Sequence, residues 1–211
     1  MMASTKRIVL ASSNRGKLAE INRIFGVFGL AGVAQSELGV ESIEETGSNF
    51  IDNALLKARH AAAVTGLPAI ADDSGLAVDA LDGEPGVRSA RYAGEPSDDQ
   101  KNIDKLLAAM KDVPDAERGA QFHCAVVFVA SATDTDPLIV DGIWRGRILH
   151  ERRGQGGFGY DPVFFDEQSG RSAAELAPAD KDRVSHRGQA MRALSNLLQS
   201  RLGASGRPPG E

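Results

Sequence analysis

The pattern of apolar residues changes halfway along the chain, and this restricts the fold more than any other feature. In the first half, short apolar runs alternate with helical patterns. An apolar run over residues 6–11 precedes a helical pattern that ends near Phe28, and a helix capped by Ser48 and extending to Thr65 precedes the run 68–71. Such alternation is typical of α/β proteins, in which helices cover a sheet.

The second half instead contains two apolar runs separated by a short turn. Residues 119–131 are the longest strand candidate, and Thr133 to Pro137 turns the chain into a second strand from Leu138 to Trp144. Two strands joined in this way pair in antiparallel fashion. The sequence therefore predicts an α/β protein with a mixed sheet rather than a purely parallel one.

Shorter signals predict the remaining elements. Residues 76–81 form a separate short strand after the acidic sequence 72–75, and Ser97 with Gln100 forms a capping box for the next helix. Ser185 caps the last helix.

Composition excludes several classes of protein. The net charge of −5 over 211 residues disfavours sequence-independent binding to a nucleic-acid duplex, so we expect no nucleic-acid partner. No apolar run approaches the ~20 residues of a membrane span, and no signal-peptide pattern precedes residues 6–11, so we expect a soluble, cytoplasmic protein without a membrane partner. Residues 1–203 are expected to form a single domain, and residues 204–211 a disordered tail.

A polar loop between the first strand and its helix has the composition of a phosphate site. Backbone N–H groups at a helix N-terminus attract anions, and a lysine in the first turn adds a positive charge. The spacing of a P-loop is absent, and an ordinary strand-to-helix turn with a solvated lysine is the alternative. The loop consists of Ser12, Ser13, Asn14, Arg15, Gly16 and Lys17.

Two pairs of neighbouring acidic residues are candidates for metal binding or acid–base chemistry. Asp72 and Asp73 are expected at the carboxyl end of a short strand, where open α/β sheets bind ligands. Neighbouring carboxylates that share a site repel each other, and a divalent cation removes that cost. Glu44 and Glu45 form a second pair that the fold could bring close. The alternative is an acidic turn in which one aspartate caps a backbone N–H group.

The helix that begins at Ser48 places two polar side chains on or beside an apolar face. Asn53 and Lys57 are one helical turn apart, among residues that otherwise suit a core. A buried lysine needs a partner or a function, whereas a lysine that reaches water needs neither. Both interpretations stay open.

Two segments in the second half could recognise a base, a carbonyl group or a phosphate. The first combines glycines, which allow a ligand to approach the backbone, with aromatic rings that can stack on a base. The second clusters hydrogen-bond donors at a helix start. Tight turns with aromatic packing and a solvated helix terminus are the alternatives. The segments contain Phe158, Gly159, Tyr160 and Asp161, and Lys181, Ser185, His186 and Arg187.

Seven segments, taken in order, resemble the inosine triphosphate pyrophosphatase family, and its bacterial branch most. The match extends over about residues 6–200, and its specificity comes from the whole set rather than from one motif. Ser13 departs from many relatives, which have Gly or His there. The segments are residues 11–17, 44–47, 53–58, 71–76, 85–92, 157–162 and 185–188.

The resemblance implies an elongated, curved α/β fold of three layers around a mixed sheet, with two lobes and a central cleft. It also implies Mg²⁺-dependent hydrolysis of ITP, dITP and XTP to the nucleoside monophosphate and pyrophosphate by a homodimer. By position, residues 12–17 would hold the triphosphate, Glu44 and Asp73 would bind the metal, Asp73 would be the base for water, and Lys57 would lie at the phosphates. Contacts mostly to base and sugar are implied for Ser74, Phe158, Gly159, Tyr160, Asp161, Lys181, His186 and Arg187.

The implied chemistry is physically consistent. Release of pyrophosphate in one piece requires attack of water on the α-phosphorus. Donors on His186 and Arg187 would pair with the 6-oxo group of inosine or xanthine and oppose the 6-amino group of adenine. Guanine also has a 6-oxo group, so its exclusion requires a further contact near position 2.

Two other classes of function remain as alternatives. A phosphatase that forms an aspartyl-phosphate on Asp72 or Asp73 would release orthophosphate. A nucleotide sensor or RNA-binding module would bind without turnover, and the acidic pairs would then have no role.

Overall fold

The computed structural model describes residues 7–204, and side-chain burial is described for residues 7–201. The strands of this part form one seven-stranded sheet in the order β2-β1-β3-β4-β5-β6-β7. β1 pairs in parallel with β2 and β3, and the other neighbours are antiparallel, so the predicted mixed sheet is confirmed. The strands are β1 (Ile8–Leu10), β2 (Gly32–Ala34), β3 (Ala69–Val78), β4 (Gly119–Val129), β5 (Leu138–Ile148), β6 (Phe164–Asp166) and β7 (Arg171–Ser172).

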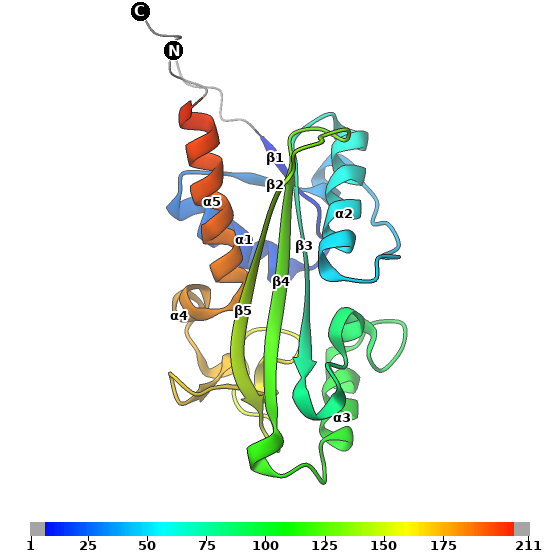
Figure 1. The fold of residues 1–211 in the computed structure, drawn as a ribbon, viewed down its shortest axis with the longest axis vertical. Coiled ribbons are helices and arrows are strands. Elements are labelled where there is room, and N and C mark those ends of the chain that lie inside the picture. Colours follow the sequence, from blue (N-terminus) through cyan, green and yellow to red (C-terminus); the bar gives the residue numbers. More distant parts are fainter. Residues whose placement is uncertain (1–6, 205–211) are drawn as a thin grey trace, which may run out of the picture.

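Three long strands form the axis of an elongated molecule (Figure 1). β3, β4 and β5 extend from one lobe into the other, while the remaining elements gather at the two ends. In one lobe α1 and α5 cover one face of the sheet and α2 covers the opposite face, which confirms the three-layer α/β architecture. The helices are α1 (Arg15–Val27), α2 (Phe50–Thr65), α3 (Asp99–Ala109), α4 (Pro178–Val184) and α5 (His186–Ala204).

Side-chain alternation along β3 shows which elements share a face of the sheet. Ile70 packs with α1 and α5, whereas Ala71 packs with the alanine-rich face of α2. Leu76, an even-numbered residue like Ile70, belongs to the apolar cluster of the other lobe, which also contains residues of α3. The face that α1 and α5 cover therefore continues into the second lobe, and polar residues separate its two apolar clusters.

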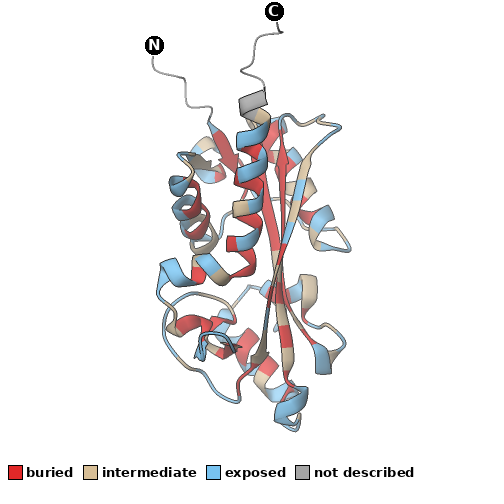
Figure 2. Cartoon of the chain, turned by 60° about the vertical axis from the view of Figure 1, so that its left-hand side comes forward, coloured by how far each residue is buried: buried red, intermediate tan, exposed pale blue. Residues whose placement is uncertain are grey.

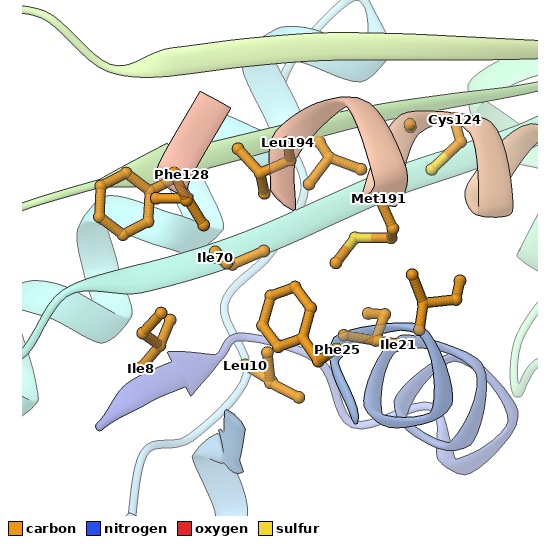
Figure 3. Packing of buried hydrophobic residues seen from close by; sticks show 13 residues of the cluster. Ile8, Leu10, Ile21, Phe25, Ile70, Cys124, Phe128, Met191 and Leu194 are labelled. Atoms are coloured by element: carbon orange, nitrogen blue, oxygen red, sulfur yellow. The ribbon is translucent and has the colours of Figure 1, made fainter. Parts of the chain in front are cut away.

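The core of the first lobe shows how the sequence pattern becomes packing. Phe25 and Ile21 of α1 lie against Leu10 of β1, Ile70 of β3 and Leu194 of α5 (Figure 3). Figure 2 shows that burial follows the inner sides of the helices and continues along the central strands. Burying side chains of this size stabilises a fold by roughly 1.5–3 kcal/mol each.

One predicted break in the sheet is wrong. Residues 69–78 form a single strand of 10 residues that pairs with β4 along its whole length, so Asp72 and Asp73 lie in mid-strand and not at a strand end. The two carboxylates are tolerated in the strand because both have charged or hydrogen-bonding partners. β1 pairs with β3 only at Ala69 and Ile70, and the next bridge on this side is at Ala77, so the edge of β3 has no neighbouring strand from Ala71 to Leu76. Gly75 permits a close approach at this edge, because a Cβ there would lie 2.2 Å from the carbonyl oxygen of Gly86.

Two predicted helix caps are displaced by one residue. Asn49 rather than Ser48 caps α2, and Asp98 rather than Ser97 caps α3, because each Asn or Asp oxygen accepts from N–H groups of the first turn. The cap at Ser185 is confirmed, since its Oγ accepts from the N–H of Gly188 at 3.1 Å. Gly66, with φ of 66°, ends α2 in the left-handed conformation.

Three further points concern the chain as a whole. The short elements β2, β7 and α4 were not among the predicted ones. Within residues 7–204 no helix combines the length and apolar character needed to cross a bilayer. Ala204 closes α5, and residues 205–211 of the predicted tail lie outside the described residues.

Candidate active site

A cavity of about 590 Å³ lies where the two lobes meet along the open edge of β3. Residues from both faces of the sheet line it, because no neighbouring strand pairs with β3 between Ala71 and Leu76. Most residues predicted for a site lie in its lining: Ser12, Ser13, Asn14, Lys17, Glu44, Lys57, Asp73, Ser74, Phe158, Gly159, Tyr160, Asp161, Lys181, His186 and Arg187. Arg15 and Gly16 are not in the lining; the side chain of Arg15 is exposed, and Gly16 lies against the ring of Phe158.

The start of α1 forms one end of the cavity. Asn14 caps the helix, and its Oδ1 accepts from the N–H of Lys17 at 3.1 Å. Ser12 Oγ accepts from the N–H of Asn14 at 3.2 Å, which orders the loop between β1 and α1. The Lys17 ammonium lies 3.0 Å from Asp72 Oδ2. A helix N-terminus and a lysine thus lie together at one wall of the cavity, an arrangement that favours the binding of an anion.

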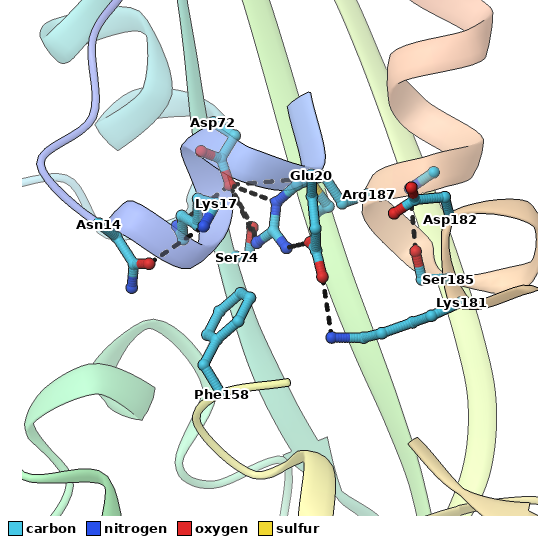
Figure 4. A network of polar contacts seen from close by, with 12 residues as sticks. Asn14, Lys17, Glu20, Asp72, Ser74, Phe158, Lys181, Asp182, Ser185 and Arg187 are labelled. Carbon is cyan, nitrogen blue, oxygen red and sulfur yellow. Dashed lines mark hydrogen bonds and ion pairs between the residues drawn. The ribbon is translucent and has the colours of Figure 1, made fainter. Parts of the chain in front are cut away.

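Asp72 and Arg187 anchor a buried network of ion pairs on the α1 and α5 side of β3 (Figure 4). Nε and Nη2 of Arg187 each lie 3.2 Å from Asp72 Oδ2, and Nη2 also donates to Ser74 Oγ at 3.1 Å. Burial alone would raise the pKa of Asp72, but Lys17 and Arg187 together hold this pKa far below its usual range. Asp72 is therefore ionised, and it does not contribute to the cavity lining.

Glu20 extends this network to the far wall of the cavity. Its carboxylate accepts from Arg187 Nη1 through one oxygen and from Lys181 Nζ, at 2.9 Å, through the other. Burial opposes ionisation of Glu20, but the two cations hold its pKa below the usual value. Lys181 also pairs with Asp161, and Lys181 Nζ lies 4.8 Å from the centroid of the Phe158 ring. Lys181 and Arg187 thus both lie near this half-buried aromatic ring.

Asp73 lies on the opposite face of β3, in contact with α2. Its Oδ2 accepts from Asn53 Nδ2 at 3.0 Å, and its Oδ1 lies 3.5 Å from Lys57 Nζ. Lys57 Nζ also donates to Glu45 Oε1 at 2.6 Å. Burial raises the pKa of Asp73, although Lys57 and Lys17 oppose this rise. Of the two interpretations of Lys57, the structure supports the paired one.

The rings near His186 form an apolar wall. His186 is 4% exposed, and its ring stacks on Phe122 with centroids 4.7 Å apart. Burial, together with the charges of Arg187 and Lys181, holds the pKa of His186 well below its usual value, so the imidazole is neutral. Its Nδ1 is buried and has no hydrogen-bond partner within the described chain. The Tyr160 hydroxyl is committed to the carbonyl oxygen of Ser89 at 2.9 Å.

Sequence reasoning missed Glu20. The residue lies three positions after Lys17 and four before Ile24, on the same side of α1, so an acidic residue on a face that otherwise becomes core was the available signal. One interpretation of Asp72 and Asp73 was a shared site, whereas alternation in β3 directs them to opposite faces and only Asp73 lines the cavity.

The acidic residues suit a divalent cation only in part. Within residues 7–204 no three His, Cys, Asp or Glu side chains are arranged to hold a metal ion. Glu44 and Asp73 nevertheless both line the cavity, and Asp73 keeps acceptor capacity beyond its hydrogen bonds. Mg²⁺ typically takes one or two carboxylates together with substrate phosphates and water, so the donor set fits such an ion when a phosphate ligand is present.

Comparison of the sequence and the structure with known proteins identifies several similar proteins. The chain is 56% identical over 195 residues to the dITP/XTP pyrophosphatases of Pectobacterium atrosepticum and Escherichia coli, a match that covers 92% of this chain and 99% of each relative. The structure resembles that of a HAM1 protein from Coxiella burnetii, with a TM-score of 0.84 and 48% identity over 92% of this chain and 98% of the other. It also resembles the Staphylococcus aureus Ham1 protein, with a TM-score of 0.81 and 38% identity over 93% of this chain and 100% of the other.

The family model covers almost the whole described chain. It matches residues 8–197, a range that includes every element from β1 to most of α5. The chain belongs to the Ham1 family.

Proposed function

We propose that this chain hydrolyses ITP, dITP and XTP to the nucleoside monophosphate and pyrophosphate. Its membership of the Ham1 family and its likeness to dITP/XTP pyrophosphatases support this activity. The observation that carries the proposal is that Lys17 and Asp73, from opposite faces of β3, open into the same cavity. A phosphate chain laid along the open edge of β3 would meet cations from one face and a carboxylate from the other.

The phosphate chain would lie at the start of α1. There the N-terminal N–H groups of the helix, Lys17 and Lys57 would neutralise charge on the phosphate oxygens. Lys17 and Lys57 are held by carboxylates on opposite sides of β3, so both ammonium groups are fixed before a substrate arrives. Such preorganised charge lowers the barrier without reorganisation during the reaction.

Asp73 would accept a proton from the water that attacks the α-phosphorus. Burial raises the pKa of Asp73, which makes its carboxylate a better proton acceptor near neutral pH. Glu44 and Asp73 would hold Mg²⁺ together with the phosphates. The bound ion would supply further neutralisation of phosphate charge and would lower the pKa of a coordinated water.

The base would occupy the wall formed by Phe158 and His186. The Phe158 ring offers a stacking face. His186, through the ring nitrogen that carries its single proton, and the remaining N–H on Nη1 of Arg187 would donate to a 6-oxo acceptor. Adenine would bring an amino donor to the same groups, which are donors themselves. Ser74, Tyr160, Asp161 and Lys181 complete this part of the lining.

A product assay tests the proposal. Incubation with ITP, dITP or XTP and Mg²⁺ should yield pyrophosphate and a monophosphate in equal amounts. Orthophosphate with a nucleoside diphosphate would instead indicate an aspartyl-phosphate mechanism, for which the buried Asp72 is poorly placed and Asp73 would be the nucleophile. Binding without either product would indicate a nucleotide sensor.

We also propose that residues 1–203 act as one catalytic domain, because both lobes contribute to the lining of the cavity. The homodimer and the cytoplasmic location are proposals that rest on the family resemblance and on composition. Sedimentation equilibrium of the purified chain and fractionation of the source cells check them.

A further inference from the structure

The segment that joins Gly39 to α2 carries Glu44 and Glu45 but has no regular secondary structure. We call residues 41–48 the acidic loop. Backbone hydrogen bonds of a helix or a strand do not hold it, yet Ile43, Glu44 and Glu45 line the cavity. Other contacts must therefore fix the position of the two carboxylates.

Side chains of α2 supply these contacts at successive helical turns. Asn53 Oδ1 accepts from the N–H of Gly47 at 2.7 Å, and Lys57 Nζ donates to Glu45 at 2.6 Å. One turn further, His60 Nε2 lies 3.1 Å from the carbonyl oxygen of Glu41. The acidic loop thus runs antiparallel along one stripe of α2, in line with the spacing of side chains on a helix.

Asn53 also contacts Asp73. Its side chain is buried, at 0% exposure, and its Nδ2 donates to Asp73 Oδ2 at 3.0 Å while its Oδ1 accepts from Gly47. A Cβ at position 47 would lie 2.5 Å from Asn53 Oδ1, so only glycine allows the loop backbone to approach so closely. One amide therefore links the carboxylate of β3 with the loop that carries Glu44.

We propose that Asn53 is a positioning residue of the reaction, which holds the Asp73 carboxylate and the acidic loop in a single relative geometry. The inference rests on the proposed function. Asn53 does not line the cavity, so it acts through Asp73 and the loop rather than through the substrate. Its removal should therefore lower kcat and leave KM for the nucleotide nearly unchanged.

The chain offers a matched control for a merely structural role. Asn102 of α3 is also buried, and its amide also makes two hydrogen bonds, accepting from Ala93 N at 2.7 Å and donating to the Ala90 carbonyl at 2.9 Å. It contacts no carboxylate in these bonds. Asn102→Ala therefore removes the same chemical group from a buried helix position that makes no direct hydrogen bond to Asp73 or to the acidic loop.

The experiment compares Asn53→Ala, Asn53→Asp and Asn102→Ala with the wild-type chain. Steady-state kinetics of pyrophosphate release from ITP give kcat and KM, thermal unfolding gives Tm, and amide hydrogen exchange reports on residues 41–48. Asn53→Asp keeps the shape of the side chain and the acceptor for Gly47, but places a carboxylate oxygen against Asp73. It therefore separates the contact with Asp73 from the contact with the loop.

For Asn53→Ala we expect kcat to fall by about tenfold or more with KM changed less than about twofold, and faster exchange in residues 41–48. For Asn53→Asp we expect a similar loss of kcat with exchange in the loop near that of the wild type. Asn102→Ala should lower Tm comparably and keep kcat within about twofold of the wild type.

Two results would overturn the inference. One is a kcat for Asn53→Ala no lower than that of Asn102→Ala, and the other is unchanged exchange in residues 41–48 of Asn53→Ala. If the wild-type chain released no pyrophosphate from ITP, dITP or XTP, the proposed function would fail separately. The exchange measurement would then still decide whether Asn53 holds the acidic loop.

Discussion

Asp72 and Asp73 are neighbours in the chain, yet their side chains lie on opposite faces of β3. Asp72 pairs with Lys17 and Arg187, whereas Asp73 contacts Asn53 and Lys57. The pair therefore divides two tasks. One carboxylate is a buried counter-charge for the cations of α1 and α5, and the other opens into the cavity.

Asp73→Asn should abolish turnover while the fold stays intact. The amide cannot accept a proton from water, and loss of a general base typically costs about 10²–10⁴ in rate. The Asn side chain keeps an oxygen that can accept from Asn53, so Tm should change little. Pyrophosphate release from ITP and thermal unfolding check this, and near-normal turnover would remove Asp73 from the proposed mechanism.

Asp72→Asn should act on stability instead. It leaves Arg187 and Lys17 buried without their carboxylate, and breaking a buried ion pair in this way costs about 3–5 kcal/mol. Denaturant unfolding at pH 7 measures the loss. A free energy of unfolding equal to that of the wild type would contradict the role of Asp72 as a counter-charge.

The same substitution should flatten the acid dependence of stability. The pKa of Asp72 is lowered in the folded chain, so its stabilising contribution is complete above the unfolded value of about 4 and is lost as pH falls below it. The difference between wild type and Asp72→Asn should therefore be largest above about pH 5 and shrink toward pH 2. Unfolding curves across this range test the sign, and a constant difference would contradict it.

Arg187→Ala should reduce the preference for ITP over ATP by about tenfold or more, because it removes the donor that we propose for the 6-oxo group. It should also destabilise the chain, since Glu20 and Asp72 lose their shared partner. The ratio of kcat/KM for the two nucleotides separates these effects. Arg23→Ala, which breaks an exposed pair with Asp182, is the control and should leave the ratio unchanged.

Removal of divalent cations should stop turnover without unfolding the chain. No three metal-ligating side chains are gathered within residues 7–204, so Mg²⁺ alone should not raise Tm measurably, whereas Mg²⁺ with a nucleotide should. Chelation followed by titration of Mg²⁺ into the assay gives the activity. Full turnover in excess chelator would contradict a role for the ion.

The single thiol should resist alkylation in the folded chain. Cys124 is buried beside Asp72, and burial raises its pKa to about 12, so the thiolate is scarce at pH 8. Iodoacetamide should modify the native protein far more slowly than the denatured one, as mass spectrometry can follow. Rapid modification of the native chain would mean that the cluster around Cys124 opens often.

Periodicity was sufficient for the antiparallel hairpin of the mixed sheet but not for the course of β3. The hairpin of β4 and β5 follows from two apolar runs around a turn, whereas Asp-Asp-Ser-Gly has the composition of a loop. These polar residues reflect the cavity beside β3. They do not mark the end of the strand, because the pairing of β3 with β4 continues past them. Local sequence does not distinguish a polar turn from a strand whose open edge borders a cavity.

The network around Glu20 shows a second limit. Glu20 and Lys181 are 161 positions apart, and only the packing of α1 against α4 and α5 brings them together. Helical periodicity indicated which residues face the inside of α1. It did not indicate that one of them, Glu20, has two cationic partners there. Candidate site residues whose residue type itself indicates their chemistry, such as Lys17 and Asp73, could be predicted from the sequence alone.

The continuous passage of β3, β4 and β5 between the lobes also limits how the enzyme can move. Two bodies joined by a flexible connector can rotate about it, but here the connection is a set of hydrogen-bonded strands of 10 and 11 residues. A change in the width of the cavity between the lobes must then come from a change in the bend of the sheet, which is distributed over many residues. The width of the cavity between the lobes is therefore an elastic property of the backbone, and substitutions far from its lining can tune it.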